Sequence, residues 1–245
     1  MNILKAVDLV KAYGGRTVVD HVSFDVTEGQ IVGLLGRNGA GKTTSFRMVI
    51  GMISGSSGRV IFNGQDVSKL AMYQRAQRGM GYLSQEPSIF QRLSVADNLL
   101  AILETLPLTR AQQKQRANEL MAQFDLLKLR RQQARTLSGG ERRKLEIARA
   151  LVTQPSLILL DEPFSGVDPV AVEELQAEIR RLREEHQIAM LVTDHNVQRT
   201  LEIVDWAYVI FEGKVFAEGP PKQIINNDQV RKLYLGSTFK GDEFD

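Results

Sequence analysis

The sequence predicts an α/β fold in which helices cover a mostly parallel sheet. Three short runs are continuously apolar, as is typical of strands that are buried on both faces: Ile31–Leu35, residues 157–160 and Ala189–Thr193. Between the second and third runs, apolar residues recur at the spacing of one helix face: Val172, Leu175, Ile179 and Leu182. A buried strand, a helix and a second buried strand in this order indicate parallel pairing.

The segments around these runs predict smaller elements. Residues 2–35 are expected to form short strands, and residues 18–26 alternate apolar and polar side chains as a half-buried strand does. We expect these strands to build an antiparallel N-terminal β-subdomain. After His195 the sequence predicts one helix and then a hairpin over residues 210–215.

Between residues 87 and 154 the strand patterns give way to helix starts. Ser94-x-x-Asp97 and Thr109-x-x-Gln112 both resemble capping signals at helix N-termini. We therefore predict that this stretch is a helical subdomain inserted into the α/β core.

The whole chain is predicted to form one domain with three parts. Its boundaries are expected as follows: 1–86 and 155–235 for the core, 87–154 for the helical subdomain, and 236–245 for a polar, poorly packed tail.

Composition excludes several classes of function. An apolar content of 43% and a charged content of 24% are those of a globular protein. The 31 basic and 29 acidic residues leave a net charge of +2, so bulk charge gives no reason to expect a nucleic-acid partner. The absence of cysteine excludes disulfides, thiol nucleophiles and cysteine-bound metals, and fits a reducing cytoplasm. No apolar run approaches the roughly 20 residues that cross a bilayer, so we expect another chain to supply any membrane part.

A phosphate-binding loop is predicted where the first buried strand ends. Residues 36–43 fit the pattern G-x-x-x-x-G-K-[ST], and a strand and a helix flank them as the pattern requires. Glycines let successive backbone N–H groups turn toward a phosphate, and the helix N-terminus adds positive potential. An ordinary glycine-rich turn is the alternative, which Lys42 and Thr43 at the required places disfavour.

The loop predicts a P-loop NTPase core that binds ATP and Mg²⁺. We expect Lys42 to bridge the β- and γ-phosphates and the Thr43 hydroxyl to ligate Mg²⁺. Arg37 occupies a variable position of the pattern. The residues predicted to contact nucleotide here are Gly36, Arg37, Asn38, Gly39, Ala40, Gly41, Lys42, Thr43 and Thr44.

Two adjacent carboxylates, Asp161 and Glu162, follow the second buried run. Ligands of open α/β sheets bind beyond the carboxyl ends of the strands, where the phosphate loop also lies. We therefore expect Asp161 to serve the metal and Glu162 to polarise the attacking water. Side chains alternate along a strand, so the two carboxylates cannot share one role. The alternative is a pair of solvated charges at a strand end.

Residues 137–141, Leu-Ser-Gly-Gly-Glu, resemble the signature motif of ATP-binding-cassette (ABC) ATPases. Ser138-x-x-Glu141 is also a capping box that would open a helix, and both interpretations can hold. The resemblance implies that Ser138, Gly139 and Gly140 bind the γ-phosphate held by a second copy. It therefore implies a homodimer that closes around two ATP molecules.

Further motifs of the ABC family follow in order along the chain. The resemblance implies that Tyr13 stacks on adenine and that Gln85 senses Mg²⁺ and joins the core to the helical subdomain. Residues 165–168 resemble the D-loop that crosses the dimer, and His195 resembles the switch histidine that contacts the γ-phosphate. Alone, Tyr13 could be a core aromatic and His195 an exposed imidazole. Their joint order favours the ABC interpretation, with Lys42, Gln85, Glu162 and His195 as catalytic residues.

Within the family, the chain is most similar to the ATPases of lipopolysaccharide export systems. The segments that carry this likeness are 88–95, 161–169, 193–197 and 234–236. The likeness implies two membrane permease subunits of the lipopolysaccharide-transport F and G type, at the cytoplasmic face of the bacterial inner membrane. Departures are Arg37 and Ser84, each in place of a common proline, and the acidic tail.

Two other functions are left open by the sequence. An ABC importer, such as one for branched-chain amino acids, has ATPases of similar length and motifs. A soluble ABC protein that acts on ribosomes or DNA usually has two cassettes or a long coiled-coil insertion, and this chain has one phosphate loop.

The segment after Gln85 is predicted to couple ATP hydrolysis to the membrane subunits. ABC transporters receive a short helix of the membrane subunit beside this loop, and such a contact needs an apolar anchor and a flanking charge. Phe90 and Arg92 fit these roles, with Pro87 stiffening the segment. In the alternative, Phe90 packs inside the helical subdomain.

Overall fold

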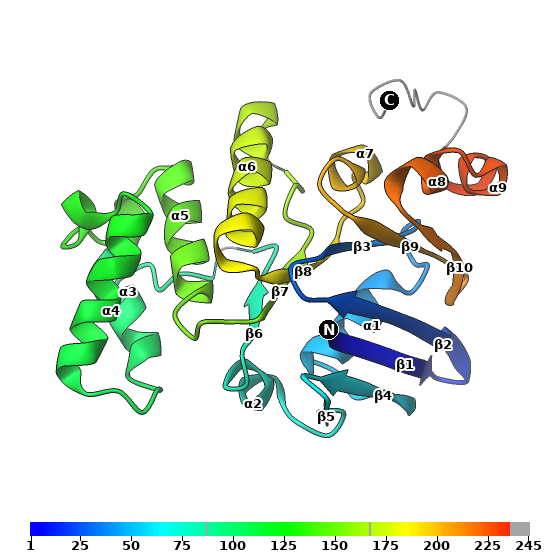
Figure 1. The fold of residues 1–245 in the computed structure, drawn as a ribbon, viewed down its shortest axis with the longest axis horizontal. Helices are drawn as coiled ribbons and strands as arrows, with labels where there is room; N and C mark the ends of the chain where they lie inside the picture. The colour runs from blue at the N-terminus through cyan, green and yellow to red at the C-terminus, as the bar shows by residue number, and fades with distance from the viewer. Residues whose placement is uncertain (87, 167, 236–245) are drawn as a thin grey trace.

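Two β-sheets organise the chain in the computed structural model, which describes residues 1–86, 88–166 and 168–235 (Figure 1). The strands of the six-stranded sheet, in spatial order, are β10 (Lys214–Gly219), β9 (Trp206–Phe211), β3 (Ile31–Leu35), β8 (Ala189–Thr193), β7 (Leu157–Asp161) and β6 (Met80–Leu83). The strands of the four-stranded sheet are β2 (Arg16–Thr27), β1 (Asn2–Tyr13), β4 (Ser57–Phe62) and β5 (Gln65–Asp66). The predictions for Pro87, Val167 and the tail 236–245 lie outside the described residues.

The six-stranded sheet is parallel from β9 to β6, and only the β9–β10 hairpin is antiparallel. Every residue of β3, β7 and β8 is buried. Side chains of β7 alternate between two apolar cores, since Ile158 and Leu160 face one core and Leu157 and Leu159 face the other. Because an apolar core covers each face of the sheet, every side chain of these strands is buried, which explains why their sequences are continuous apolar runs. The predicted α/β fold with a mostly parallel sheet is confirmed.

Helices cover the two faces of this sheet differently. On one face lie α6 (Pro169–His186) and α7 (Val197–Leu201), which pack into the first core. On the other face, α1 (Lys42–Ile50) packs with the four-stranded sheet into the second core. The α6 side chains at the buried positions are those expected from helical spacing: Val172, Leu175, Ile179 and Leu182.

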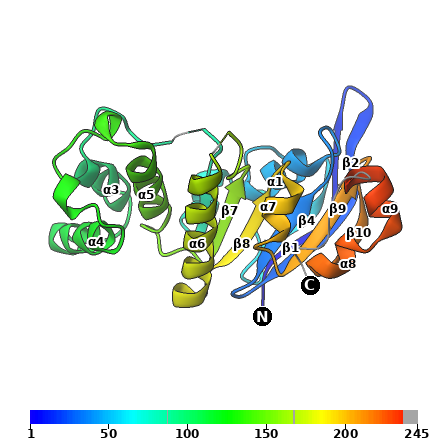
Figure 2. The ribbon, with the colours of Figure 1, turned by 90° about the horizontal axis from the view of Figure 1, so that it is seen from above.

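The N-terminal strands pair antiparallel, as predicted, but the expectation of short strands is wrong. β1 and β2 are 12 residues each, and their hairpin projects from the body of the molecule (Figure 2). Several register shifts interrupt the β1–β2 ladder, and Asp8 and His21 have positive φ values of 48° and 54°. Such bulges bend a long hairpin and increase its twist, so the alternation of apolar residues is broken without the strand ending.

Helices alone occupy the far end of the molecule (Figures 1 and 2). They are α3 (Val95–Leu103), α4 (Arg110–Gln123), α5 (Gly139–Ala150) and the 3₁₀ turns Leu127–Leu129 and Ala134–Thr136. Both predicted caps are confirmed, because Ser94 accepts from the N–H of Asp97 and Thr109 accepts from the N–H of Gln112.

The remaining helices are short. They are α2 (Met72–Ala76), α8 (Pro221–Ile225), α9 (Asp228–Val230) and a π-helical turn, Arg231–Leu235. In the described part of the chain, none of the helices combines the length and the apolar character that crossing a membrane requires.

One buried arginine ties α2 to the end of α1. Arg75 is 2% exposed, and its guanidinium donates to the carbonyl oxygens of Met48 at 2.8 Å, Leu70 at 3.0 Å and Ser68 at 3.1 Å, and also to Val49. The carbonyls at a helix C-terminus have no partner within the helix, so a cation there stabilises it. Burial lowers the pKa of Arg75 to about 10, which leaves the side chain charged at neutral pH.

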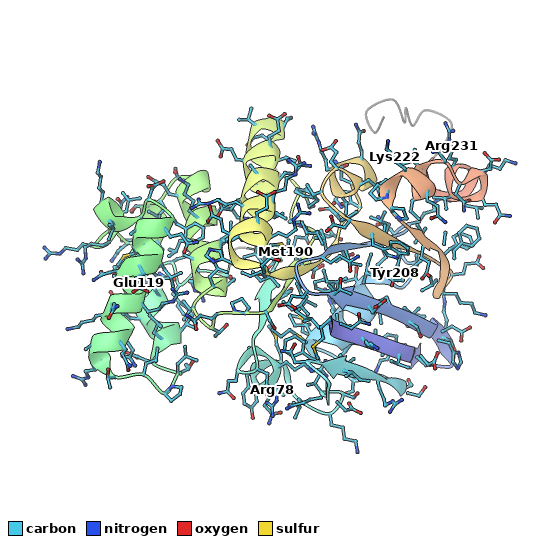
Figure 3. The ribbon with its side chains drawn as sticks, in the orientation of Figure 1. Arg78, Glu119, Met190, Tyr208, Lys222 and Arg231 are labelled. Atoms are coloured by element: carbon cyan, nitrogen blue, oxygen red, sulfur yellow. The ribbon has the colours of Figure 1, made fainter. Side chains whose placement is uncertain are left out.

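We expect Arg75→Met to lower the free energy of unfolding by about 3 kcal/mol, because several buried carbonyls lose a charged donor. Chemical denaturation of the two proteins measures this difference. Arg78→Met is the matched control, since Arg78 lies nearby at the surface (Figure 3) and its side chain, among the described residues, donates only to the Gln74 carbonyl. Its expected effect is below about 0.5 kcal/mol. Equal effects of the two substitutions would contradict the role given to Arg75.

Candidate nucleotide-binding site

The loop between β3 and α1 has the backbone that a phosphate requires. Gly36, Gly39 and Gly41 have positive φ values of 147°, 79° and 107°. A Cβ at Gly41 would lie 2.6 Å from the Val18 carbonyl oxygen, and one at Gly36 would collide with that of Ile210. Only glycine fits these two positions. Gly41 is the N-cap of α1 and offers no side-chain cap, which leaves the first N–H groups of the helix directed at a ligand.

Lys42, the first residue of α1, is 5% exposed and donates to the Arg37 carbonyl at 3.2 Å. Burial lowers the pKa of the Lys42 ammonium, and the charges of Glu162 and Asp194 partly offset this effect. Thr43 and Thr44 follow at half-buried positions. The ammonium is therefore held against the loop, within the field of two carboxylates that follow other strands of the sheet.

The two predicted carboxylates diverge at the end of β7. Asp161 is 7% exposed and accepts a hydrogen bond from the Tyr82 hydroxyl at 3.3 Å. Burial raises the pKa of Asp161, and the Tyr82 bond opposes this rise. Glu162 has a positive φ of 47°, and its N–H donates to the Thr193 carbonyl of β8 at 2.7 Å. This turn directs the Glu162 side chain away from that of Asp161 and toward the residues after β8.

His195 lies beside Glu162. Its Nδ1 is 3.5 Å from Glu162 Oε2 and 3.6 Å from Asp194 Oδ1. Asp194 itself was missed by the sequence reasoning. It is fully buried and accepts from the N–H groups of Phe164 at 2.9 Å and Asn196 at 2.8 Å.

Asp194 thereby holds together the segments that follow β7 and β8. Burial raises the pKa of its carboxyl, although the two backbone N–H groups and His195 favour the charged form. A signal was present in the sequence, because Asp194 follows a buried strand in the same way that Glu162 does.

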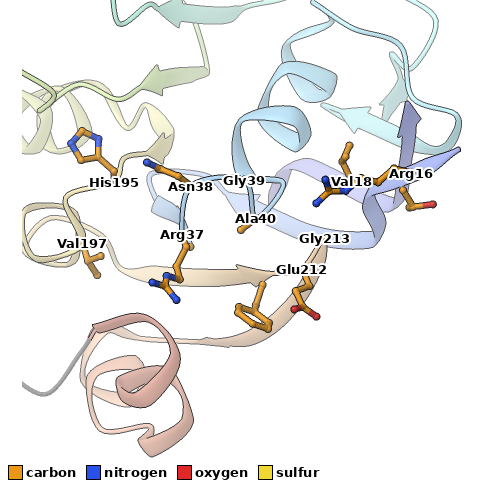
Figure 4. Close-up of a pocket in the computed structure, with 13 residues that line it drawn as sticks. Arg16, Val18, Arg37, Asn38, Gly39, Ala40, His195, Val197, Glu212 and Gly213 are labelled. Atoms are coloured by element: carbon orange, nitrogen blue, oxygen red, sulfur yellow. The ribbon is translucent and has the colours of Figure 1, made fainter. Parts of the chain in front are cut away.

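A cavity of about 890 Å³ opens over the phosphate loop (Figure 4). It brings residues 36–40 of the loop together with His195, with Arg16 and Val18 of β2, and with the β9–β10 turn at Glu212. Tyr13 is not among its lining residues. Tyr13 is 51% exposed and pairs across the hairpin with Arg16, so it lies next to the cavity rim.

The signature-like residues lie in a different place. Ser138 caps α5, accepting from the N–H of Glu141 at 3.3 Å while the Glu141 carboxylate accepts from the Ser138 N–H at 2.8 Å. These hydrogen bonds lower the pKa of Glu141. Among the described residues, no atom lies within 4 Å of the position that a Cβ would take at Gly139 or Gly140. The predicted capping box is confirmed, and the two glycines face open space.

Gly139 and Gly140 line a second groove of about 470 Å³. Gln85 and Glu162 lie in the same groove, together with Ser165 and Gly166 of the D-loop-like segment. Gln85 Nε2 donates to Ser165 Oγ at 3.3 Å. Within the described chain, the signature-like glycines do not line the cavity over the phosphate loop. The predicted site residues therefore form two groups on one molecule.

The predicted coupling residues lie at the surface near α5. The Phe90 ring is 45% exposed, so the alternative in which it packs inside the helical region is not observed. The Arg149 guanidinium lies over this ring at 4.6 Å. The buried Asn98 side chain fixes the backbone of Phe90, accepting from its N–H at 2.8 Å and donating to its carbonyl at 3.0 Å. Arg92 is exposed.

A phosphate loop between β3 and α1, with carboxylates at the end of a neighbouring parallel strand, defines a nucleotide-hydrolysing P-loop fold. The chain belongs to the ABC transporter family, whose sequence pattern matches residues 19–165. It is an ATP-hydrolysing ABC ATPase, and members of this family bind ATP or ADP and work with membrane permease subunits.

Several known proteins are similar along almost the whole chain. A protein of Haemophilus influenzae named "Lipopolysaccharide export system ATP-binding protein LptB" is 49% identical over 98% of this chain and 100% of its own length. The protein of the same name in Escherichia coli K12 is also 49% identical, with the same coverage. The crystal structure of the ADP conformation of MJ1267, an ATP-binding cassette of an ABC transporter, has a TM-score of 0.85 at 28% identity, covering 97% of this chain and 100% of that one.

We expect Asp194→Asn to reduce the turnover number for ATP by about tenfold or more while the affinity for ATP changes less than twofold. The N–H groups of Phe164 and Asn196 donate to different oxygens of the carboxylate, and an amide has only one oxygen, so His195 and the segment at Phe164 lose their common anchor. Steady-state ATPase rates and calorimetric titration measure the two quantities.

The control for this substitution is Asp228→Asn, at an exposed position in the first turn of α9. It should behave as wild type in both measurements. Wild-type turnover in Asp194→Asn would show that Asp194 does not position the site.

Proposed function

We propose that this chain is the motor subunit of an exporter that extracts lipopolysaccharide from the bacterial inner membrane. The observation that carries the proposal is the 49% identity, from end to end, to proteins named for the lipopolysaccharide export system. An ABC importer, such as one for branched-chain amino acids, remains the alternative, because the ATPase site described above would serve either direction of transport.

We infer that two copies sandwich two ATP molecules. The loop at Gly36–Lys42 offers donors for one side of a triphosphate, whereas the open glycines at the start of α5 lie in another groove of the same chain. A capped helix N-terminus with two glycines can bind an anion, and this one does not line the cavity over the phosphate loop of its own chain. A second copy, turned to face the first, would bring its Ser138, Gly139 and Gly140 to the γ-phosphate.

The catalytic roles then follow from the geometry. Lys42 and the α1 N–H groups would hold the phosphates, and the buried position of Lys42 strengthens this attraction. Glu162 would orient the attacking water, because its carboxylate is turned out of β7 toward His195. His195 is half-exposed and lies 3.5 Å from Glu162. It would contact the γ-phosphate and couple this contact to the conformation of the segment after β8.

The residues at the end of β7 fit a magnesium ion. In the described residues, no group of three or more His, Cys, Asp or Glu side chains could enclose a metal. Mg²⁺ prefers one or two protein oxygens together with phosphate and water, so a single buried carboxylate suits it. Asp161, Thr43 and Gln85 would hold the ion, which neutralises phosphate charge when bound. Tyr82 would orient the Asp161 carboxylate through its hydroxyl.

Coupling to the membrane would pass through the segment at Phe90 and Arg92. Asn98 and Arg149 hold this segment in place, and the half-exposed Phe90 ring offers an apolar anchor beside the Arg92 charge. We propose that in each copy this segment receives a short helix from one of two permease subunits of the F and G type, at the cytoplasmic face of the inner membrane. Residues 87–154 would then move as a helical subdomain against a core of residues 1–86 and 155–235.

Affinity purification of the tagged chain from native membranes tests the proposed partners. We expect two permease subunits and periplasmic lipopolysaccharide-transport components to copurify. Capture of a periplasmic solute-binding protein in their place would favour the importer.

Phe90→Ala should abolish this copurification while leaving the isolated subunit nearly unchanged. A half-exposed ring buries little surface, so we expect less than about 1 kcal/mol of lost stability and an unaltered basal ATPase rate. The matched control is Leu127→Ala, which truncates a side chain that is 43% exposed elsewhere in the helical region and should retain the partners. Full copurification of Phe90→Ala would contradict the coupling role, as would a stability loss of the 3–5 kcal/mol typical of a core Phe.

A further inference from the structure

The end of β1 carries a contact that the functions above do not use. The Lys11 ammonium lies over the ring of Tyr13, 5.0 Å from its centroid, and donates to the Ser54 carbonyl at 2.7 Å. Residues two apart on a strand share one face, which allows Lys11 to reach the ring. The cation is thus held over one face of the aromatic ring that the family resemblance assigns to adenine.

The segment that holds Lys11 is the one that follows the phosphate-binding helix. After α1 ends at Ile50, Ser54 accepts from Lys11, and the Ser56 N–H donates to the Val10 carbonyl at 2.7 Å. Ser56 Oγ also accepts from the Ala12 N–H at 3.2 Å. The last residues of β1 are therefore fixed to the chain that leaves α1, the helix whose other end holds Lys42.

Tyr13 lies beside a residue that lines the cavity over the phosphate loop. Its cross-strand partner is Arg16, which lines the cavity over the phosphate loop, and opposite residues of a hairpin lie side by side. The ring is 51% exposed, so covering by Lys11 leaves a face for a base.

We propose that Lys11 is a positioning residue for the nucleotide base, an inference that rests on the proposed ATP site. A cation is attracted to the negative face of an aromatic ring and limits the rotation of the ring. It also draws π-electron density toward itself, which reduces the repulsion between the opposite face and the π-system of adenine. Lys11 therefore orients Tyr13 and strengthens its stacking on the base, without touching the phosphates.

Calorimetric titration with two ligands tests this role. ATP has the base and inorganic tripolyphosphate lacks it, so a residue that acts through the base affects only the affinity for ATP. We expect Lys11→Met to weaken ATP binding about two- to fivefold, the size of one exposed cation–π contact, and to leave tripolyphosphate binding unchanged. Lys11→Arg keeps the cation and should bind ATP within twofold of wild type.

Two further variants make the outcomes distinguishable. Lys5→Met removes another lysine of β1, at an exposed position, and should bind both ligands as wild type does. Tyr13→Ala should weaken ATP binding at least as much as Lys11→Met does, again without effect on tripolyphosphate. If Tyr13→Ala weakens ATP binding and Lys11→Met does not, the role of Lys11 is overturned and the ATP site stands.

An equal loss of affinity for both ligands in Lys11→Met would also overturn the proposal, because the substitution would then act through the fold or through the net charge of the site. Failure of the wild-type protein to bind either ligand would overturn the proposed function itself.

Discussion

The parallel pairing of β3, β8 and β7 is the constraint on which the rest of the site depends. The three strands run side by side in register, with Leu34 opposite Thr193 and Thr193 opposite Asp161, so their carboxyl ends meet at one edge. The phosphate loop, the carboxylates and His195 leave the sheet at that edge. A slip of one residue would exchange the two faces of a strand and turn Asp161 toward the wrong core. The apolar cores on both faces therefore fix the geometry of the catalytic groups.

Charged groups of both signs meet at this edge. Glu162 and Asp194 act on the buried ammonium of Lys42, and Asp161 lies in the field of the Arg47 guanidinium. A triphosphate adds several negative charges, so additional positive potential would stabilise it. The α1 N–H groups supply part of it, a divalent cation at Asp161 would supply more, and the α5 N-terminus of a second copy would supply the remainder. The potential that a second α5 N-terminus would add and the separation of the two grooves favour the same two-copy arrangement.

The features that local chemistry determines could be predicted from the sequence. The phosphate loop, the buried strands and the caps at Ser94 and Ser138 depend on residues close together in the chain. Asp194 was missed because its importance lies in a hydrogen bond to Phe164, 30 residues away. Arg75 was missed for the same reason, since its partners in α1 are 26 and 27 residues distant. The lengths of β1 and β2 were underestimated because bulges interrupt the alternation on which a strand prediction rests.

The central claim is that each ATP site is shared by two copies, and the mass of Glu162→Gln in solution tests it most directly. This substitution blocks the hydrolysis that would separate the two copies. In the presence of ATP and Mg²⁺, light scattering should therefore give a mass twice the 27.4 kDa of one chain. Adding Gly139→Trp to this variant should restore the monomer while leaving the monomer fold intact, because a side chain there meets open space in its own chain. A monomer in the presence of ATP and Mg²⁺, or a dimer that persists in the double variant, would contradict the shared site.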